Sequence, residues 1–224
     1  MTLLHKKNKK IVIFIPSIEF GGVEKNLYIL IEYLQKNFSQ IFIVTASKIN
    51  QKINKKRIKI ISPSSNYWNR KSRFLKSMIS SFLLFKNFEK SEIIVISFQS
   101  NIFSLIVSKL MFWPIIIRLN TSPEKYANNL LKLFLFKYLY KLSNEIIVNS
   151  HDFKKNLKRI FNLSSSVILN PFKKKKLQNK KIQFFKNFRG LKIINIARLT
   201  DQKDHITLLR SINMIVKNNK LDLR

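Results

Sequence analysis

The segment from Lys9 to Leu34, KKIVIFIPSIEFGGVEKNLYILIEYL, constrains the fold more than any other part of the chain. Ile11 to Ile15 is a continuous apolar run rich in β-branched residues, which is typical of a strand buried on both faces in a parallel sheet. Pro16 ends this run, and a helical spacing of apolar residues begins at Val23. The expected core-facing stripe of this helix comprises Val23, Leu27, Leu30, Ile31 and Leu34, with Glu24, Lys25, Glu32 and Gln35 outside it.

Gly21 and Gly22 occupy the turn between the expected strand and helix. The free N–H groups of a first helical turn favour an anion, and the absence of a Cβ would let a phosphate or a sugar come close. A second interpretation is that the glycines only allow the chain to turn. These two residues alone leave both interpretations open.

The same strand-and-helix unit recurs along the chain. Apolar runs predict strands over residues 40–46, 57–61, 92–98, 114–119, 145–148 and 167–169, and helical periodicity predicts helices over 69–88, 101–112, 126–142 and 151–161. In the helix 69–88 the apolar stripe is Phe74, Leu75, Met78, Phe82 and Phe85. This alternation indicates an α/β protein with a doubly wound parallel sheet, a Rossmann-like fold.

Ligands of such sheets bind outside the carboxyl ends of the strands. The candidates for a binding site are therefore the residues that directly follow each strand. They are Gly21, Gly22, Ser97 to Gln99, Arg118 to Thr121, Asn149 to Asp152, and Asn170. Ser150 also has the position and chemistry of a helix N-cap.

A lysine-rich segment divides the chain. We expect an N-terminal Rossmann-like domain over residues 1–171 and a basic linker over 172–190. Residues 191–224 then begin a second α/β domain, with a buried strand over 191–197 and a helix over 205–216. One strand and one helix cannot bury their own faces, so we expect this second domain to be incomplete and the sequence to be part of a longer protein.

The formal net charge of +32 favours anionic partners, but lysine dominates it, because only 9 of the 43 basic residues are arginine. Recognition of bases and bidentate binding of phosphate favour arginine, so no specific nucleic-acid partner is expected. An anionic membrane surface is the more general partner that such a charge attracts. The chain has no cysteine, and its 3 histidines are not spaced as metal ligands, so we expect no metal.

The apolar stretch from Ile93 to Ile117 is interrupted by polar residues and by Pro114, so it predicts strand, helix and strand rather than a membrane span. The N-terminus is too short and too charged for a signal peptide. We therefore expect a cytoplasmic protein that lies at most peripherally at the inner face of the membrane.

Four short segments carry a resemblance when they are taken in order. They are GGVEK (21–25), IIVNS (146–150), VILNP (167–171), and IARL (196–199) followed by Lys203. Together they resemble glycosyltransferase family 4, whose members use nucleotide sugars and have the GT-B fold of two facing Rossmann-like domains. Departures are Ala197 and Asp204 where members often have glycine, and Arg118 to Thr121 where many have a histidine.

The resemblance implies that Gly21 and Gly22 approach the donor diphosphate from one domain, and that Arg198 and Lys203 bind it from the other. It also implies acceptor-side or sugar-side contacts, for which the candidates are Glu24, Arg118, Asn120, Ser150 and Asn170. The implied activity moves a sugar from a nucleotide-diphosphate donor to a saccharide or lipid-linked acceptor, with retention of configuration and without a cofactor.

The implied context is the synthesis of a cell-surface polysaccharide or glycolipid. No catalytic residue is assigned, because the paired-glutamate motif of the family is not found in these 224 residues. The alternative is a catalytically inactive fragment, or a basic module that binds polyanions or membrane surfaces.

Overall fold

The computed structural model describes residues 10–18, 21–48, 57–126, 129–171, 193–197 and 199–219. The chain divides into two compact units, residues 1–174 and 175–224, and each is described by itself. The expected basic linker over 172–190 falls entirely within residues 172–192, which lie outside the described part of the chain.

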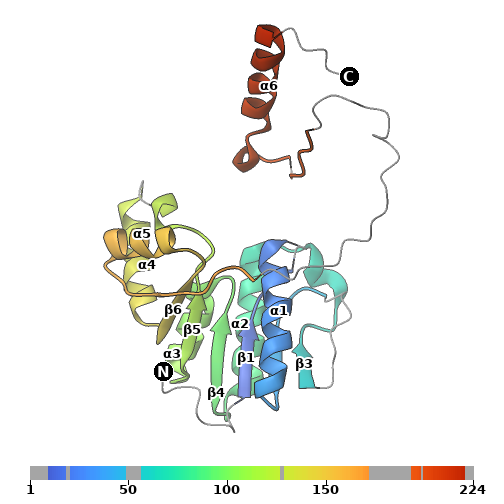
Figure 1. The fold of residues 1–224 in the computed structure, drawn as a ribbon. Coiled ribbons are helices and arrows are strands. Elements are labelled where there is room, and N and C mark those ends of the chain that lie inside the picture. Colours follow the sequence, from blue (N-terminus) through green and yellow to red (C-terminus); the bar gives the residue numbers. More distant parts are fainter. Residues whose placement is uncertain are drawn as a thin grey trace. The chain divides into compact units, whose positions relative to one another are not determined.

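The first unit is built on a seven-stranded parallel sheet with the order β3-β2-β1-β4-β5-β6-β7 (Figure 1). The strands are β1 (Lys10–Phe14), β2 (Ile41–Val44), β3 (Ile58–Ile61), β4 (Ile93–Ser97), β5 (Ile115–Arg118), β6 (Glu145–Val148) and β7 (Ser166–Val167). The chain moves outward from β1 to β3 and then returns to the other side of β1 with β4. This is a doubly wound α/β sheet, and the predicted fold class is confirmed.

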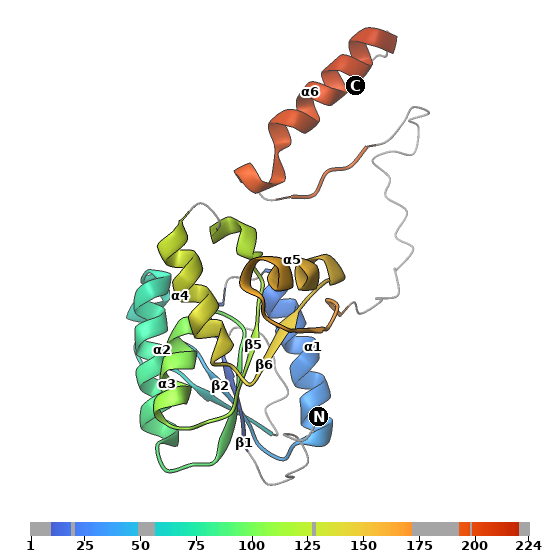
Figure 2. The same ribbon diagram turned by 90° about the vertical axis from the view of Figure 1, so that its left-hand side faces the viewer.

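Helices cover both faces of this sheet, with α1 on one side and α2, α3 and α4 on the other (Figure 2). The helices of the first unit are α1 (Gly22–Asn37), α2 (Arg73–Phe88), α3 (Asn101–Leu110), α4 (Leu130–Lys141) and α5 (His151–Phe161), with short 3₁₀ turns η2 (Asn66–Arg70) and η3 (Pro123–Tyr126). Among the described residues, no helix is long and apolar enough to cross a membrane.

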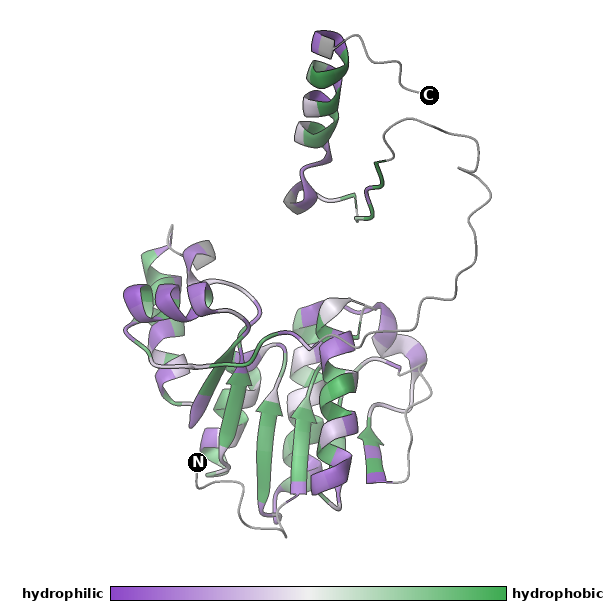
Figure 3. Ribbon diagram, in the orientation of Figure 1, coloured by the Kyte–Doolittle hydropathy of each residue, from purple (hydrophilic) through white to green (hydrophobic). Residues whose placement is uncertain are grey.

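The central strands are hydrophobic along most of their length (Figure 3), because both of their faces are covered. On the α1 side, Ile11 and Ile13 pack with Leu27 and Ile31 of the helix. On the other side, Val12 and Phe14 belong to a second core that also receives side chains from α2 to α5. Alternate residues of one strand therefore join the sheet to both helix layers.

The apolar stripe of α2 does not face the sheet. Phe74 is 62% exposed and Phe82 is 55% exposed, whereas Leu84 is fully buried. The side of α2 that packs inward consists of Lys76, Ser77, Ser80, Leu84 and Phe88. Small serine side chains allow close approach to α3, and Ser77 Oγ lies 2.6 Å from Ser100 Oγ at the start of that helix.

In the second unit, the prediction of a buried strand at residues 191–197 is wrong for the described residues 193–197. They form no strand, and Ile194 and Ile196 are 80% and 86% exposed. An isolated extended segment has no neighbouring strand to pair with and no layer to cover it. The predicted helix is present as α6 (His205–Asn219), preceded by the short turn η5 (Asp201–Lys203).

Candidate functional site at the carboxyl edge of the sheet

Polar side chains gather at the carboxyl ends of β1, β4 and β5. All strands are parallel, and the strand order changes direction between β1 and β4, which is the position where doubly wound sheets form their ligand crevice. The backbone joins the two strands there, because Phe98 N–H donates to Phe14 O at 3.0 Å. The first turn of α1 and the start of α3 therefore lie at this edge.

The turn before α1 is closed by a carboxylate. Gly21 N–H donates to Glu24 Oε2 at 2.7 Å, an arrangement in which the third helical residue reaches back to the N-cap. Glu24 is only 4% exposed, so the prediction that it lies outside the inward-facing stripe of α1 is wrong. The buried stripe is Glu24, Leu27, Ile31 and Leu34, because residues three and four apart share one face of a helix.

This contact occupies the Gly21 amide inside the protein, whereas Gly22 stays open. A Cβ on Gly21 would meet Glu24 Oε2 at 3.0 Å, but a Cβ on Gly22 would have no heavy atom within 4 Å. One turn further along α1, burial and then the charge of Glu24 raise the pKa of Tyr28, so this phenol stays protonated at neutral pH. Of the two glycines, Gly22 is thus the one with space beside it for a ligand.

Replacing Glu24 with alanine is expected to lower the free energy of unfolding by about 2 kcal/mol, because a charge-assisted hydrogen bond and a helix cap are lost together. Glu24→Gln keeps an oxygen acceptor and is expected to lose about half as much. Urea unfolding followed by circular dichroism measures both changes, with the exposed neighbour Lys25→Ala as control. Equal stability of Glu24→Ala and the wild type would show that the cap contributes nothing.

A second cluster connects α1, β5 and the segment after β7. The amide oxygen Oδ1 of Asn170 accepts two hydrogen bonds, from Asn26 Nδ2 and from Arg118 Nη2, both at 2.8 Å. Asn26 lies in the first turns of α1, and Arg118 is the last residue of β5. Residues separated by up to 144 positions in the chain therefore meet at one point.

Arg118 is a buried cation, only 7% exposed, and its guanidinium lies 5.7 Å from the centre of the Phe98 ring. Burial lowers the pKa of this guanidinium, but an arginine still stays protonated at neutral pH. Its Nε is buried and has no hydrogen-bond partner within the described residues. An unsatisfied buried donor on a cation is the kind of group that an anionic or hydroxyl-rich ligand satisfies.

Serine and asparagine side chains hold the ends of β4 and β5 in place. Ser97 Oγ is 2.8 Å from both Asn101 Oδ1 and Ser104 Oγ, and Asn101 Nδ2 donates to Arg118 O at 3.1 Å. Asn120 Nδ2 donates to Phe98 O at 2.7 Å. The Asn120 amide group therefore fixes the loop after β4.

The remaining predicted residues are placed as follows. Ser150 is the N-cap of α5, as predicted, because its Oγ accepts from Phe153 N–H at 3.1 Å. Lys203 is exposed at the end of η5, directly before α6. Arg198 lies outside the described residues, so its side chain is not placed. Within the first unit, the structure brings together Asn26, Arg118 and Asn170.

Reasoning from the sequence missed Asn26, whose only signal is its position one helical turn after Gly22. It named Ser97 as a candidate but missed its partners Asn101 and Ser104, because small polar residues at a helix start are common in loops. Within the described ranges, no group of three or more histidine, aspartate or glutamate side chains could hold a metal ion.

The fold places the first unit among Rossmann-like α/β domains, whose ligands generally bind at the topological switch of the sheet. The Anabaena protein HepE, crystallised with UDP and glucose, matches 73% of this chain and 45% of its own length at 14% identity, with a TM-score of 0.54. Its complex with UDP-glucose matches at 13% identity, over 73% of this chain and 44% of HepE, with a TM-score of 0.53. These likenesses show a shared α/β fold.

A third structure, that of the lipopolysaccharide outer core galactosyltransferase WaaB without ligand, matches 75% of this chain and 47% of its own length, at 15% identity and a TM-score of 0.48. The chain thus spans less than half the length of each of these proteins. A scan against protein-family models and a search of curated proteins found no match.

Proposed function

We propose that this chain belongs to a nucleotide-sugar-dependent glycosyltransferase of the GT-B type, related to glycosyltransferase family 4. The observation that carries the proposal is the buried Arg118, which shares the Asn170 oxygen with Asn26 at the carboxyl edge of a doubly wound sheet. HepE, which has the same fold, binds UDP and UDP-glucose, and this supports a nucleotide sugar as the ligand here. The acceptor would be a saccharide or a lipid-linked saccharide in the synthesis of a cell-surface polysaccharide or glycolipid.

In this proposal, Gly22 allows the donor diphosphate to approach the first turn of α1, where backbone amides favour an anion. By the resemblance to the family, Arg198 and Lys203 would add positive charge at the donor diphosphate, which stabilises the leaving group as the bond to the sugar breaks. Arg118, Asn120 and Asn170 would contact the sugar or the acceptor, with Glu24 and Ser150 holding the two helix starts beside them. The proposed reaction retains the anomeric configuration and uses no metal.

The direct test is the equilibrium binding of UDP-glucose to the full chain, measured by saturation-transfer NMR across a salt series. An oligonucleotide is tested in parallel as a second ligand. A nucleotide-sugar site predicts binding that survives at about 0.3 M NaCl, beyond the screening range of surface charge. The net charge of +32 supports a basic polyanion-binding module as the second candidate. Steep salt dependence for the oligonucleotide, with no UDP-glucose binding at any salt, would establish that second candidate.

Replacing Gly22 with alanine is expected to weaken UDP-glucose binding about tenfold, because the new methyl group occupies the space proposed for the ligand. The fold should tolerate it, since that space is empty and a change from glycine to alanine at a compatible backbone position stabilises by about 0.4–1 kcal/mol. The thermal midpoint of the variant, measured beside its affinity, separates the two effects. Wild-type affinity in a stable Gly22→Ala variant would remove this turn from the binding site.

A further inference from the structure

The helix layer of α2, α3 and α4 presents a large apolar surface to solvent. Leu131 is 85% exposed and Phe134 is 73% exposed, both on α4. The other exposed members of this apolar helix face are Phe74, Leu75, Met78, Phe82 and Phe85 on α2, Ile106 and Leu110 on α3, and Leu130, Leu135 and Tyr138 on α4. Apolar patches of this kind on a protein surface mark sites of interaction.

The three helices are neighbours, so these side chains form one surface. α2 packs against α3, where the rings of Phe74 and Phe103 meet edge to face at 5.5 Å, and α3 packs against α4. All three cover the same side of the sheet, opposite α1 (Figure 2). The sides of these helices that face away from the sheet therefore point in the same general direction.

The charge on this layer has a single sign. The sequences of α2, α3 and α4 contain seven basic residues and no acidic residue. Lys76 is buried and Lys109 is partly buried, whereas the remaining five are exposed: Arg73, Lys86, Lys132, Lys137 and Lys141. The layer thus combines exposed leucine and phenylalanine side chains with flanking cations.

We propose that the apolar helix face docks onto a lipid bilayer surface that contains anionic headgroups. Leucine and phenylalanine side chains can enter the boundary between headgroups and acyl chains, while lysine stems extend along the apolar surface and keep their ammonium groups at the phosphates. The charge argues against a second copy of this chain as the occupant, because a twofold contact would place these cations against each other. The partner must instead be both apolar and anionic, as a bilayer surface is.

This inference does not depend on the proposed transferase activity. It also differs from attraction to a membrane by lysine charge alone, for example by the lysines of the expected linker, because it assigns the contact to folded helices of the first unit. The two mechanisms predict different environments for a probe on α4. A linker contact through lysines alone would leave that probe in water.

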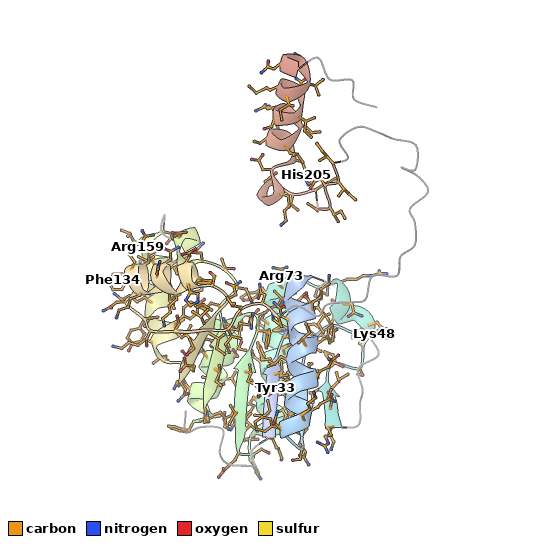
Figure 4. All side chains as sticks on the ribbon, in the orientation of Figure 1. Tyr33, Lys48, Arg73, Phe134, Arg159 and His205 are labelled. Carbon is orange, nitrogen blue, oxygen red and sulfur yellow. The ribbon has the colours of Figure 1, made fainter. Side chains whose placement is uncertain are left out.

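The test uses the absence of cysteine in the chain, which allows a single polarity-sensitive dye to be attached at Phe134→Cys, with Tyr33→Cys as the control. Tyr33 is 64% exposed and lies on α1, and Figure 4 labels both positions on their separate helices. With vesicles of phosphatidylglycerol and phosphatidylcholine, we expect a blue-shifted and several-fold brighter emission at position 134 and none at position 33. Vesicles of phosphatidylcholine alone should give a much smaller change, and high salt should weaken the binding.

A second variant tests whether the apolar side chains themselves contribute. Leu131→Ser combined with Phe134→Ser is expected to lower vesicle partitioning at least tenfold in a flotation assay, whereas Tyr33→Ser leaves it unchanged. Unaltered melting curves would show that both variants keep the fold. Wild-type partitioning by the double variant, equal dye responses at positions 33 and 134, or self-association without vesicle binding would each overturn the proposal.

Discussion

Replacing Leu84 with alanine is expected to destabilise the protein by about 2–5 kcal/mol, whereas Phe82→Ala on the same helix should change stability by about 0.5 kcal/mol or less. Leu84 is fully buried in the core between α2 and the sheet, and truncation there would leave a cavity. Phe82 is 55% exposed, so its ring loses little contact when it is removed. The larger side chain is thus expected to matter less.

The two variants are compared by urea unfolding of the full chain, monitored by circular dichroism. The comparison requires that the free energy of unfolding falls with urea concentration at the same slope in both variants. Leu83→Ala is a useful third variant, because Leu83 lies between them in the sequence and is partly buried. Its loss of stability should fall between the other two. A greater loss for Phe82→Ala than for Leu84→Ala would mean that α2 presents its phenylalanine stripe to the sheet.

This helix also shows where reasoning from the sequence reaches its limit. Periodicity located α2, since its apolar residues keep helical spacing, but two stripes satisfy that spacing equally well. One carries the large residues such as Phe74 and Phe82, and the other carries Ser77, Ser80 and Leu84. Hydrophobicity favours the first stripe, whereas close packing against a neighbouring helix favours the small residues of the second, and packing is visible only in three dimensions.

The strands were easier to predict, because a strand that is covered on both faces is mostly apolar whatever its neighbours are. β6 was predicted at its observed bounds, Glu145–Val148, and the other strands of the first unit overlap their expected ranges. The segment 193–197 is different, because an apolar run predicts a strand only where a neighbouring strand accepts its hydrogen bonds.

For the candidate site, the rule that ligands bind after parallel strands selected Arg118 and Asn170 from the sequence. Their direct contact could not be predicted, because it depends on where the chain passes after β7. Glu24 was assigned the wrong environment, because a carboxylate is normally placed outside a buried stripe unless its partner is known. That partner is the Gly21 amide, which the helix start positions 2.7 Å away.

Arg118→Met is expected to weaken UDP-glucose binding by about 10- to 100-fold while changing stability by less than about 1 kcal/mol. The binding loss follows from removing a charged donor whose Nε has no partner within the described residues. The fold should tolerate the change because methionine fills a similar volume and removes the cost of burying a charge. Asn170 Oδ1 would also keep its second hydrogen bond, from Asn26 Nδ2.

Two further variants separate charge from geometry in the proposed site. Arg118→Lys keeps the positive charge but loses the planar array of donors, so it should recover only part of the affinity. Arg159→Met is the control, because the Arg159 side chain is 69% exposed and pairs with Glu124 at 3.1 Å. This variant should leave binding unchanged within about twofold. Wild-type affinity in a stable Arg118→Met variant would show that Arg118 does not bind the ligand. Its role would then be limited to the hydrogen bond that holds Asn170 in place.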